Sequence, residues 1–243
     1  IAVPAYEQSS DQEVAFQAVD YILRVLKKNM VFGMTWGRAM HEFVEQLAKD
    51  ERLRSLSFQN VKVVPFLGTP GAIQSDSWNT TTYSNTLATK VGNLLHCASY
   101  NLSAPMYVEG TKEKELIESI DEIAKVLHMA ETADIALIGI GSMQDDSSII
   151  KAEIRTKEEY KELVRKGAVG EIVGRIYDKN GQTVDEDLKR KMVGISLDKI
   201  AKIPVRVGMS YGKDKIEAIK GAIAGGLVNV LVTDVPTAEL LLK

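Results

Sequence analysis

Short apolar segments that run into glycine or hydroxyl-bearing turns recur along this chain of 243 residues. The first covers residues 30–32 and continues through Thr35 and Gly37 into a helix whose apolar positions have helical spacing. Similar segments cover residues 61–67, 134–142, 204–208 and 229–234, and predicted amphipathic helices alternate with them. Because short buried strands alternate with helices, the strands are expected to pair in parallel.

The pattern predicts an α/β fold, with a Rossmann-like, mostly parallel sheet and helices on both faces. In such sheets ligands bind at the carboxyl ends of the strands. Polar or glycine-containing turns are expected at that edge at residues 35–38, 68–69, 141–142 and 208–215, and their convergence predicts a small-molecule site. The candidates in and directly after the first three turns are Thr35, Gly37, Arg38, Ala39, Gly68, Thr69, Gly141 and Ser142.

The turn from Thr35 to Arg38 has the pattern of an anion site. A strand that enters a helix through a glycine turn leaves backbone N–H groups at the helix N-terminus, and the helix dipole favours an anion there. Arg38 stands in the first helical turn, where a cation opposes the dipole, so a bound anion would relieve this placement. The alternative is that Gly37 only permits a tight turn and that Arg38 is solvated.

Two further charged residues are candidates for the same site. Glu171, flanked by Gly170 and apolar residues, could accept hydrogen bonds from sugar hydroxyls, or it could be a paired acid of the core. Lys215 opens a helix near the 208–215 turn and could neutralise a phosphate or simply face water.

Composition limits the classes of protein that remain. A net charge of −3 does not suggest a nucleic-acid surface on this chain. The single cysteine, Cys97, excludes an internal disulfide and a cysteine-based zinc cluster. No apolar run approaches the length of a membrane span and no secretory signal is visible, so we expect a cytoplasmic protein without a membrane partner.

Motifs for catalysis and for cofactor binding are missing from the sequence. His41, His96 and His128 all fall within predicted helices, away from the candidate turns. No Walker lysine, histidine zinc pattern or nucleophile elbow occurs, and residues 139–141 lack the third glycine of a dinucleotide fingerprint. Asp145 and Asp146 could bind a metal, but adjacent acids in a polar loop are usually solvated. We therefore expect no cofactor, no metal and no catalytic residue.

Several stretches together resemble a known family. They read MTWGR at residues 34–38, GIGS at 139–142, GAVGE at 167–171, YDKNG at 177–181 and VLVTD at 230–234, followed by Thr237 and Ala238. In order and spacing they resemble the effector-binding, or sugar-binding, domain of SorC/DeoR-type bacterial transcriptional regulators. The resemblance covers nearly the whole chain.

The resemblance implies a fold related to glucosamine-6-phosphate deaminase, ribose-5-phosphate isomerase and CoA transferases. It implies a phosphorylated sugar or related metabolite as effector, and a homodimer or homotetramer. In the family a helix-turn-helix module binds operator DNA, and the first helix here lacks a preceding helix-turn pair and a basic face. We expect residues 1–243 to form the sensor, with a small inserted subdomain around 68–110. The DNA-binding module is then missing from this chain, which begins at Ile1.

The resemblance also implies roles for individual residues. It places Thr35, Gly37, Arg38 and Ala39 at the family's phosphate-holding helix N-terminus. Ala39 stands where members often have a hydroxyl residue, so one side-chain contact to the phosphate is missing and Arg38 is expected to compensate.

Three other positions bear on the effector. Leu67 falls near a position where some members carry a phosphate-binding arginine or a Schiff-base lysine, which argues against a covalent effector. Glu171 matches the acid that binds sugar hydroxyls, and Lys215 matches the usual basic residue. The 208–215 turn departs from the common Gly-Gly form at this point.

Three functions are compatible with these features. The leading one is a metabolite sensor without chemistry of its own, in which the effector shifts the arrangement of subunits and alters operator affinity. The alternative is a sugar-phosphate isomerase or deaminase, but it needs an acid/base pair beside the phosphate, and the histidines are misplaced for that. The third is an oligomerisation module whose pocket has decayed.

Overall fold

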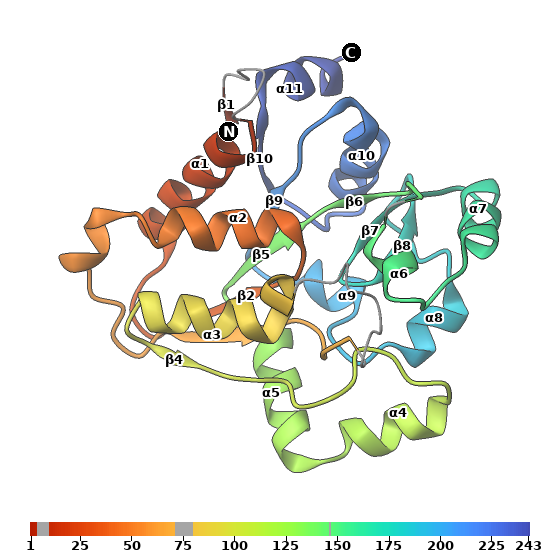
Figure 1. Cartoon of the computed structure of the whole chain (residues 1–243), viewed down its shortest axis with the longest axis horizontal. Helices are drawn as coiled ribbons and strands as arrows, with labels where there is room; N and C mark the ends of the chain where they lie inside the picture. Colours follow the sequence, from red (N-terminus) through yellow and green to blue (C-terminus); the bar gives the residue numbers. More distant parts are fainter. Residues whose placement is uncertain (4–9, 71–79, 146) are drawn as a thin grey trace.

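The structure, a computed structural model, describes residues 1–3, 10–70, 80–145 and 147–243. Within these residues a seven-stranded sheet has the order β1-β10-β9-β5-β2-β3-β4, and every neighbouring pair is parallel (Figure 1). The predicted mostly parallel sheet is therefore confirmed. Its strands are β1 (Ala2–Val3), β2 (Val31–Met34), β3 (Lys62–Pro65), β4 (Ala98–Ser99), β5 (Ile135–Gly139), β9 (Val205–Met209) and β10 (Val230–Asp234).

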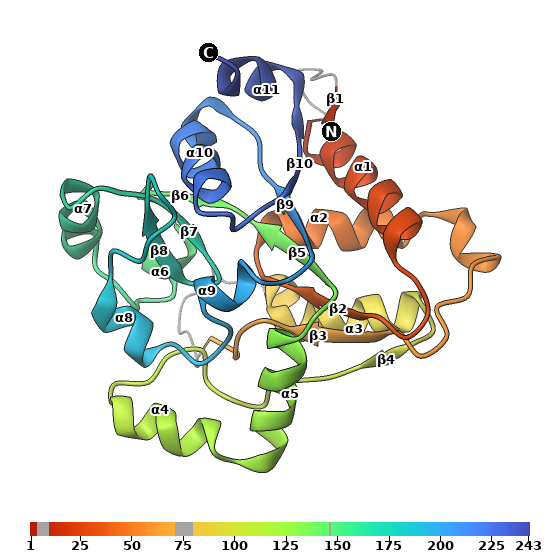
Figure 2. The same cartoon turned by 180° about the vertical axis from the view of Figure 1, so that it is seen from behind.

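Helices cover both faces of this sheet, as Figures 1 and 2 show from opposite sides. Strand β5 illustrates the cause, because successive side chains of a strand point to opposite faces. Ile135 and Leu137 pack with α1, α2 and α3, whereas Ala136 and Ile138 pack with α5 and α10. The helices named here are α1 (Ser10–Val25), α2 (Arg38–Leu47), α3 (Ser84–Leu94), α5 (Asp121–Glu131) and α10 (Ile216–Ala224). A further helix, α11 (Val235–Leu241), follows β10.

The chain order reverses between β2 and β5. From β2 the chain continues through β3 to β4 at one edge, whereas from β5 it continues through β9 to β10 toward the other edge. The connections that leave β2 and β5 therefore diverge, which opens a crevice at the carboxyl ends of these two strands.

A second, antiparallel sheet lies beside the main one. Its order is β6-β7-β8, with β6 (Gly141–Ser142), β7 (Ala168–Ile172) and β8 (Arg175–Asp178). The strand-like pattern of residues 167–177 predicts one continuous strand, which is wrong, because Val173 and Gly174 have φ values of 56° and 69° and close a two-residue hairpin turn. The expected turn after it, at residues 178–181, is present: Gly181 N–H donates to the Asp178 carbonyl at 2.9 Å.

Shorter helices complete the fold: α7 packs against β7 of the second sheet, whereas α4 packs against α5 and α8 (Figure 1). No described helix has the length and apolar character that a membrane crossing needs. These helices are α4 (Thr111–Glu118), α6 (Ser148–Lys151), α7 (Lys157–Arg165), α8 (Glu186–Lys191) and α9 (Leu197–Ile200), and the 3₁₀ turns are η1 (Glu51–Arg54), η2 (Thr80–Thr82) and η3 (Lys213–Lys215).

The sequence of residues 103–108 predicts a short strand, but in the structure this segment forms only isolated bridges. Thr69 pairs with Pro105, and Tyr107 pairs with Met192. Pro105 has no N–H group and cannot extend a ladder. Within the expected subdomain at 68–110, residues 71–79 lie outside the described residues, and β4 pairs with β3 of the main sheet. A subdomain boundary there stays a prediction.

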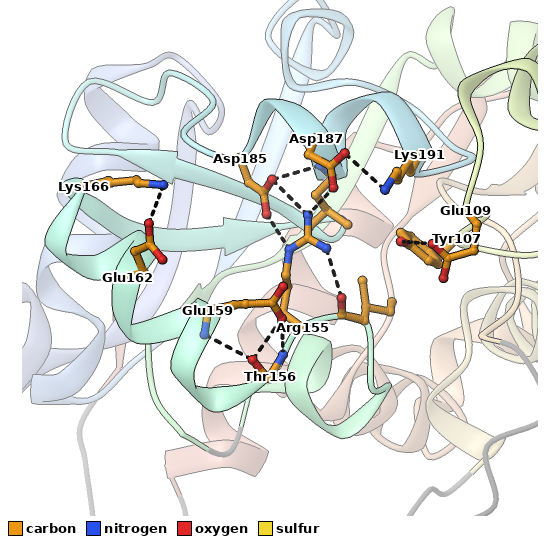
Figure 3. Close-up of polar contacts among 12 residues, drawn as sticks. Tyr107, Glu109, Arg155, Thr156, Glu159, Glu162, Lys166, Asp185, Asp187 and Lys191 are labelled. Atoms are coloured by element: carbon orange, nitrogen blue, oxygen red, sulfur yellow. Dashed lines mark hydrogen bonds and ion pairs between the residues drawn. The ribbon is translucent and has the colours of Figure 1, made fainter.

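An ion cluster joins the segment directly before α7 to the start of α8 (Figure 3). The Arg155 guanidinium donates to Asp185 at 2.8 and 3.1 Å and to Asp187 at 3.0 Å, and Asp185 also accepts from Leu188 N–H at the start of α8. The Arg155 and Asp185 side chains are only 10% and 7% exposed. Because the guanidinium binds Asp185 in bidentate form, it holds the two helices together and offsets a buried charge.

Replacing Arg155 with Met should lower the free energy of unfolding by about 3 kcal/mol, since Asp185 is left as a buried, unpaired carboxylate. Urea unfolding followed by circular dichroism measures this loss. The control is Glu162→Gln, which breaks the exposed Lys166–Glu162 pair drawn in the same figure and should leave the midpoint nearly unchanged. Equal losses in both variants would contradict the structural role given to Arg155.

Candidate functional site

A pocket of about 370 Å³ opens at the carboxyl ends of β2, β5 and β9, where the chain order reverses. This is the position at which open parallel sheets bind ligands, and the volume suits a small metabolite. The turn after β2, the link between β5 and β6, and the loop after β9 each contribute to the wall. The lining residues are Asp11, Trp36, Gly37, Arg38, Ala39, Glu42, Gly139, Ile140, Gly141, Glu171, Met209, Ser210, Tyr211, Asp214 and Lys215.

The turn between β2 and α2 is held by backbone contacts. Gly37 precedes α2 with a φ of 104°, a left-handed conformation that favours glycine, and its N–H donates to the Thr82 carbonyl at 3.0 Å. The hydroxyl oxygen of Thr35 accepts from Gly139 N–H at 3.0 Å. Glycine offers no side chain to cap the first turn of α2, and Gly37, Arg38 and Ala39 at the start of this helix all line the pocket.

Glu171 lies on the inner wall of the pocket and is 7% exposed. Strand β6 brings it there, because Gly141 is the register partner of Glu171. Its carboxylate accepts hydrogen bonds from Gly174 N–H and from the Trp36 side chain. Burial raises the pKa of Glu171, while the Gly174 amide, the nearby charge of Lys215 and the Trp36 bond act in the opposite direction.

The close approach of the Glu171 side chain to β6 leaves little room for a side chain at position 141. A Cβ atom at Gly141 would lie 2.8 Å from Oε2 of Glu171, closer than such contacts normally occur. Gly139 differs, because a Cβ there would meet its nearest neighbour, the Trp36 carbonyl oxygen, at an ordinary 3.5 Å.

The loop after β9 supplies the opposite wall with both signs of charge. The Ser142 hydroxyl donates to Asp214 at 3.2 Å, which ties this loop to β6. Lys215 Nζ lies 4.0 Å from the Asp214 carboxylate, so the two side chains form a loose ion pair. Lys215 is also close enough to Glu171 to favour its ionised form.

The charged side chains of the lining are the cations Arg38 and Lys215 and the acids Asp11, Glu42, Glu171 and Asp214. A uniformly basic pocket would bind anions of many kinds. This lining combines two cations with carboxylates, and carboxylates accept hydrogen bonds from ligand hydroxyls. The arrangement therefore fits a ligand that has both an anionic group and hydroxyl groups.

The structure brings together six of the ten predicted site residues. Gly37, Arg38, Ala39, Gly141, Glu171 and Lys215 line the pocket. Thr35 and Ser142 lie behind the lining and position it through the hydrogen bonds to Gly139 and Asp214.

Gly68 and Thr69 lie away from the lining of this pocket. Thr69 accepts a hydrogen bond from Asn85 at 2.8 Å, and Gly68 lies against the carbonyl groups of Ala104 and Pro105. The turn that contains them follows β3, which lies on the far side of β2 from β5 and β9. In the part of the chain that the structure describes, this turn has a packing role.

Sequence reasoning missed several lining residues. Trp36 and Asp214 lie inside the predicted turns at residues 35–38 and 208–215. A polar or aromatic side chain within such a turn could have been included among the candidate site residues. Asp11 and Glu42 lie on helices that were expected only to pack, and no local pattern marks them.

The three histidines do not line the pocket. His41 lies in α2 and His128 in α5, as expected, but His96 lies just beyond α3 with a φ of 51°. The described residues contain no group of three possible metal ligands, and Asp146 of the Asp145–Asp146 pair lies outside them.

Comparison with known proteins identifies the family. The family model of the sugar-binding domain matches residues 1–243. The sorbitol operon regulator of Klebsiella pneumoniae is 30% identical over 222 residues, which cover 90% of this chain and 67% of that regulator. This chain belongs to the SorC-type sugar-binding domain family.

Other members agree in sequence and in structure. Transcriptional regulator LsrR of Escherichia coli K12 is 30% identical over 230 residues, which cover 93% of this chain and 67% of LsrR. The crystal structure of the full-length sorbitol operon regulator SorC from K. pneumoniae matches with a TM-score of 0.88 at 27% identity, over 99% of this chain and 75% of that chain. The SorC-type domain described here is thus the effector-binding domain of a transcriptional regulator. These relatives are regulators, which does not favour the isomerase or deaminase alternative.

Replacing Gly141 with Ala in this SorC-type domain should lower the free energy of unfolding by about 1–3 kcal/mol, because the new methyl group overpacks the contact with Glu171. The matched variant Gly139→Ala meets only ordinary contacts and should cost far less. Urea unfolding of both proteins measures the difference. A cost for Gly139→Ala as large as that for Gly141→Ala would contradict the packing described for β6 and β7.

The raised pKa of Glu171 predicts a pH-dependent stability. Above pH 4.5, the ordinary pKa of a glutamate, Glu171 loses its carboxyl proton in the unfolded chain but keeps it in the folded protein. The protonated carboxyl therefore stabilises the folded state fully only below this pH, and its contribution to the free energy of unfolding is lost as pH rises through the folded pKa. Unfolding free energies measured at several pH values should therefore show that Glu171→Gln gains stability relative to the unsubstituted protein as pH rises above 4.5. The exposed control Glu122→Gln should show no such trend, and a flat difference for Glu171→Gln would refute the assignment.

Proposed function

We propose that this domain binds a phosphorylated sugar, or a closely related phosphorylated metabolite, in the pocket at the carboxyl ends of β2, β5 and β9. The observation that carries the proposal is the juxtaposition of the α2 N-terminus, with Arg38, and the buried acid Glu171 in one pocket. One part suits an anion, and the other suits hydroxyl groups.

The anionic end of the effector is proposed to bind at the start of α2. Helix N-termini present amide groups and a positive dipole end to an anion. Arg38 adds a guanidinium with a geometry that matches phosphate oxygens, and Lys215 adds a second cation from the opposite wall. Ala39 contributes no side-chain hydrogen bond, so Arg38 carries more of this interaction.

The hydroxyl-bearing end is proposed to lie toward Glu171 and Asp214. Both acids are fixed, since Glu171 accepts from Gly174 and Trp36, and Asp214 accepts from Ser142. Acceptors that are held in place lose little conformational entropy when they bind a ligand. This arrangement also speaks against a decayed pocket, because the cavity is open and its polar groups are ordered by hydrogen bonds.

The regulatory output is proposed to follow the family. The effector would shift the equilibrium between arrangements of a homodimer or homotetramer and so change the affinity for operator DNA, with DNA contacts made outside the matched part of the relatives. Because operator DNA of a bacterium lies in the cytoplasm, we propose the cytoplasm as the location of this regulator. The domain itself performs no reaction in this proposal.

A thermal-shift screen against sugars and their phosphates tests the proposal. A ligand that binds the folded state raises the melting temperature by mass action. We expect a shift with at least one sugar phosphate and a smaller or absent shift with its unphosphorylated parent. Turnover of a sugar phosphate, followed by NMR, would instead support an enzyme, and no shift across the panel would refute the proposed effector class.

Arg38→Ala should weaken binding of the responding sugar phosphate by about 1–3 kcal/mol, the range for loss of a charge-assisted hydrogen bond. Isothermal titration calorimetry measures the change. Arg165→Ala, which removes an exposed arginine of α7 outside the pocket, is the control and should bind as the unsubstituted protein does. Unchanged affinity in Arg38→Ala would remove the α2 N-terminus from the site.

A further inference from the structure

Asp11 and Tyr211 meet at the wall of the pocket, although nothing in the sequence pattern joins them. Asp11 stands in the first turn of α1, and Tyr211 stands in the loop after β9. Both side chains line the pocket, and the Tyr211 hydroxyl donates a hydrogen bond to the Asp11 carboxylate. Helix α1 therefore reaches a site that is otherwise built by the carboxyl ends of the strands.

Tyr211 is held between two anchored neighbours. Ser210 donates its N–H to the Val232 carbonyl and its hydroxyl to the Ile140 carbonyl, both at 3.3 Å. On the other side, Gly212 N–H donates to the Thr237 hydroxyl oxygen at 2.8 Å. Gly212 has a φ of 105°, which turns the chain directly after Tyr211. The tyrosine thus enters the pocket wall at a position that the backbone fixes on both sides.

The surroundings of the Tyr211 hydroxyl join three elements of the fold. Asp11 comes from α1, Arg38 and Glu42 come from α2, and the charges of all three act on the tyrosine. Arg38 and Glu42 lie one helical turn apart on the same helix. The hydroxyl therefore shares the pocket with the proposed anion-binding arginine and with two acids, and the charges of all three act on it.

This group of side chains has spare hydrogen-bonding capacity. A carboxylate offers about four lone-pair sites, and the Tyr211 hydroxyl occupies one of those on Asp11. The tyrosine oxygen itself can still accept a hydrogen bond while its proton is donated to Asp11. Burial and the neighbouring acid both keep this hydroxyl protonated by raising its pKa. A ligand hydroxyl at this point would find two acceptors, Asp11 and Tyr211, in the same pocket as Arg38.

We propose that Asp11 and Tyr211 are specificity-determining residues of the effector site, which bind a hydroxyl group of the effector adjacent to its phosphate. The inference rests on the proposed function of the pocket. In this proposal Asp11 and Tyr211 select among sugar phosphates by contacting their hydroxyl groups. The α2 N-terminus binds the phosphate, which these ligands share. Helix α1 is then a wall of the site.

The alternative role for the pair is structural, in which the bond only fastens α1 to the loop after β9. A structural role predicts that substitution weakens all ligands alike or none of them. A specificity role predicts that substitution changes the order of preference among sugar phosphates and leaves inorganic phosphate unaffected, because that ion has no sugar hydroxyl.

Isothermal titration of the domain with inorganic phosphate, glucose 6-phosphate, fructose 6-phosphate, ribose 5-phosphate and sorbitol 6-phosphate separates these roles. The variants are Asp11→Asn and Tyr211→Phe, each of which removes one hydrogen-bonding function at nearly constant shape. The matched control is Asp121→Asn, which removes the equivalent exposed acid from the first turn of α5, away from the pocket. It reproduces the lost helix-dipole interaction without touching the site.

We expect the ratio of affinities between the best and the worst sugar phosphate to change about tenfold in both variants, the size of one hydrogen bond to a charged group. The dissociation constant for inorganic phosphate should change by no more than about twofold in either variant, a small difference in binding free energy. Asp121→Asn should bind all five probes as the unsubstituted protein does. Unchanged ratios, or a uniform loss that includes inorganic phosphate, overturn the inference.

Two further outcomes distinguish this inference from the function on which it rests. If the unsubstituted domain binds inorganic phosphate but does not discriminate among the sugar phosphates, the specificity role is overturned while the anion site stands. If the unsubstituted domain binds none of the five probes, the proposed function fails and this inference fails with it.

Discussion

The pairing of β5 with both β2 and β9 determines where a ligand can bind. Met34 is the register partner of Leu137, and Gly139 is the partner of Met209, so β5 and β9 end at the same level and β2 ends two residues earlier. Because the chain order reverses between β2 and β5, the connections beyond these ends spread apart instead of packing together. The pocket wall formed by the turn after β2, the β5–β6 link and the loop after β9 follows from this register.

The second sheet completes the pocket by adding a buried carboxylate. Strand β6 continues directly from β5 and pairs with β7, which carries Glu171 into contact with the main sheet. A buried carboxylate without partners would cost several kcal/mol, but Gly174 and Trp36 donate to this one. Trp36 belongs to the turn after β2. The hydrogen bond from Trp36 to Glu171 therefore links the two sheets across the wall of the site.

Local sequence patterns predicted the parallel sheet and the first layer of helices, because each element has its own apolar periodicity. The hairpin at Val173 and Gly174 was missed because valine, a β-branched residue, rarely adopts a positive φ and reads as a strand residue. The Gly68–Thr69 turn was assigned to the site because it ends a strand on the correct edge. Its strand, β3, lies beyond β2, where the chain does not reverse, so that turn packs against neighbouring loops.

Residues that enter the pocket from distant elements could not be predicted, since their roles depend on tertiary contacts. Asp11 reads as an ordinary acid at the start of α1, favourable for the helix dipole. Only the packing of α1 beside the loop after β9 places its carboxylate against Tyr211 and the pocket. The residues proposed to bind the phosphate can be recognised from the local sequence pattern of a strand, a glycine turn and a helix. The residues proposed to bind the hydroxyl groups have no such pattern.

The charge balance of the lining limits the kind of anion that the proposed site accommodates. The cations Arg38 and Lys215 share the pocket with four acids, and burial raises the pKa of one of them, Glu171. A phosphate at the α2 N-terminus gains from local amides and the guanidinium, whereas a second anionic group on the ligand would approach the remaining carboxylates. Like charges at close range in a partly buried site cost affinity. The lining therefore favours an effector with one anionic end and a remainder rich in hydroxyl groups over one that is anionic at both ends.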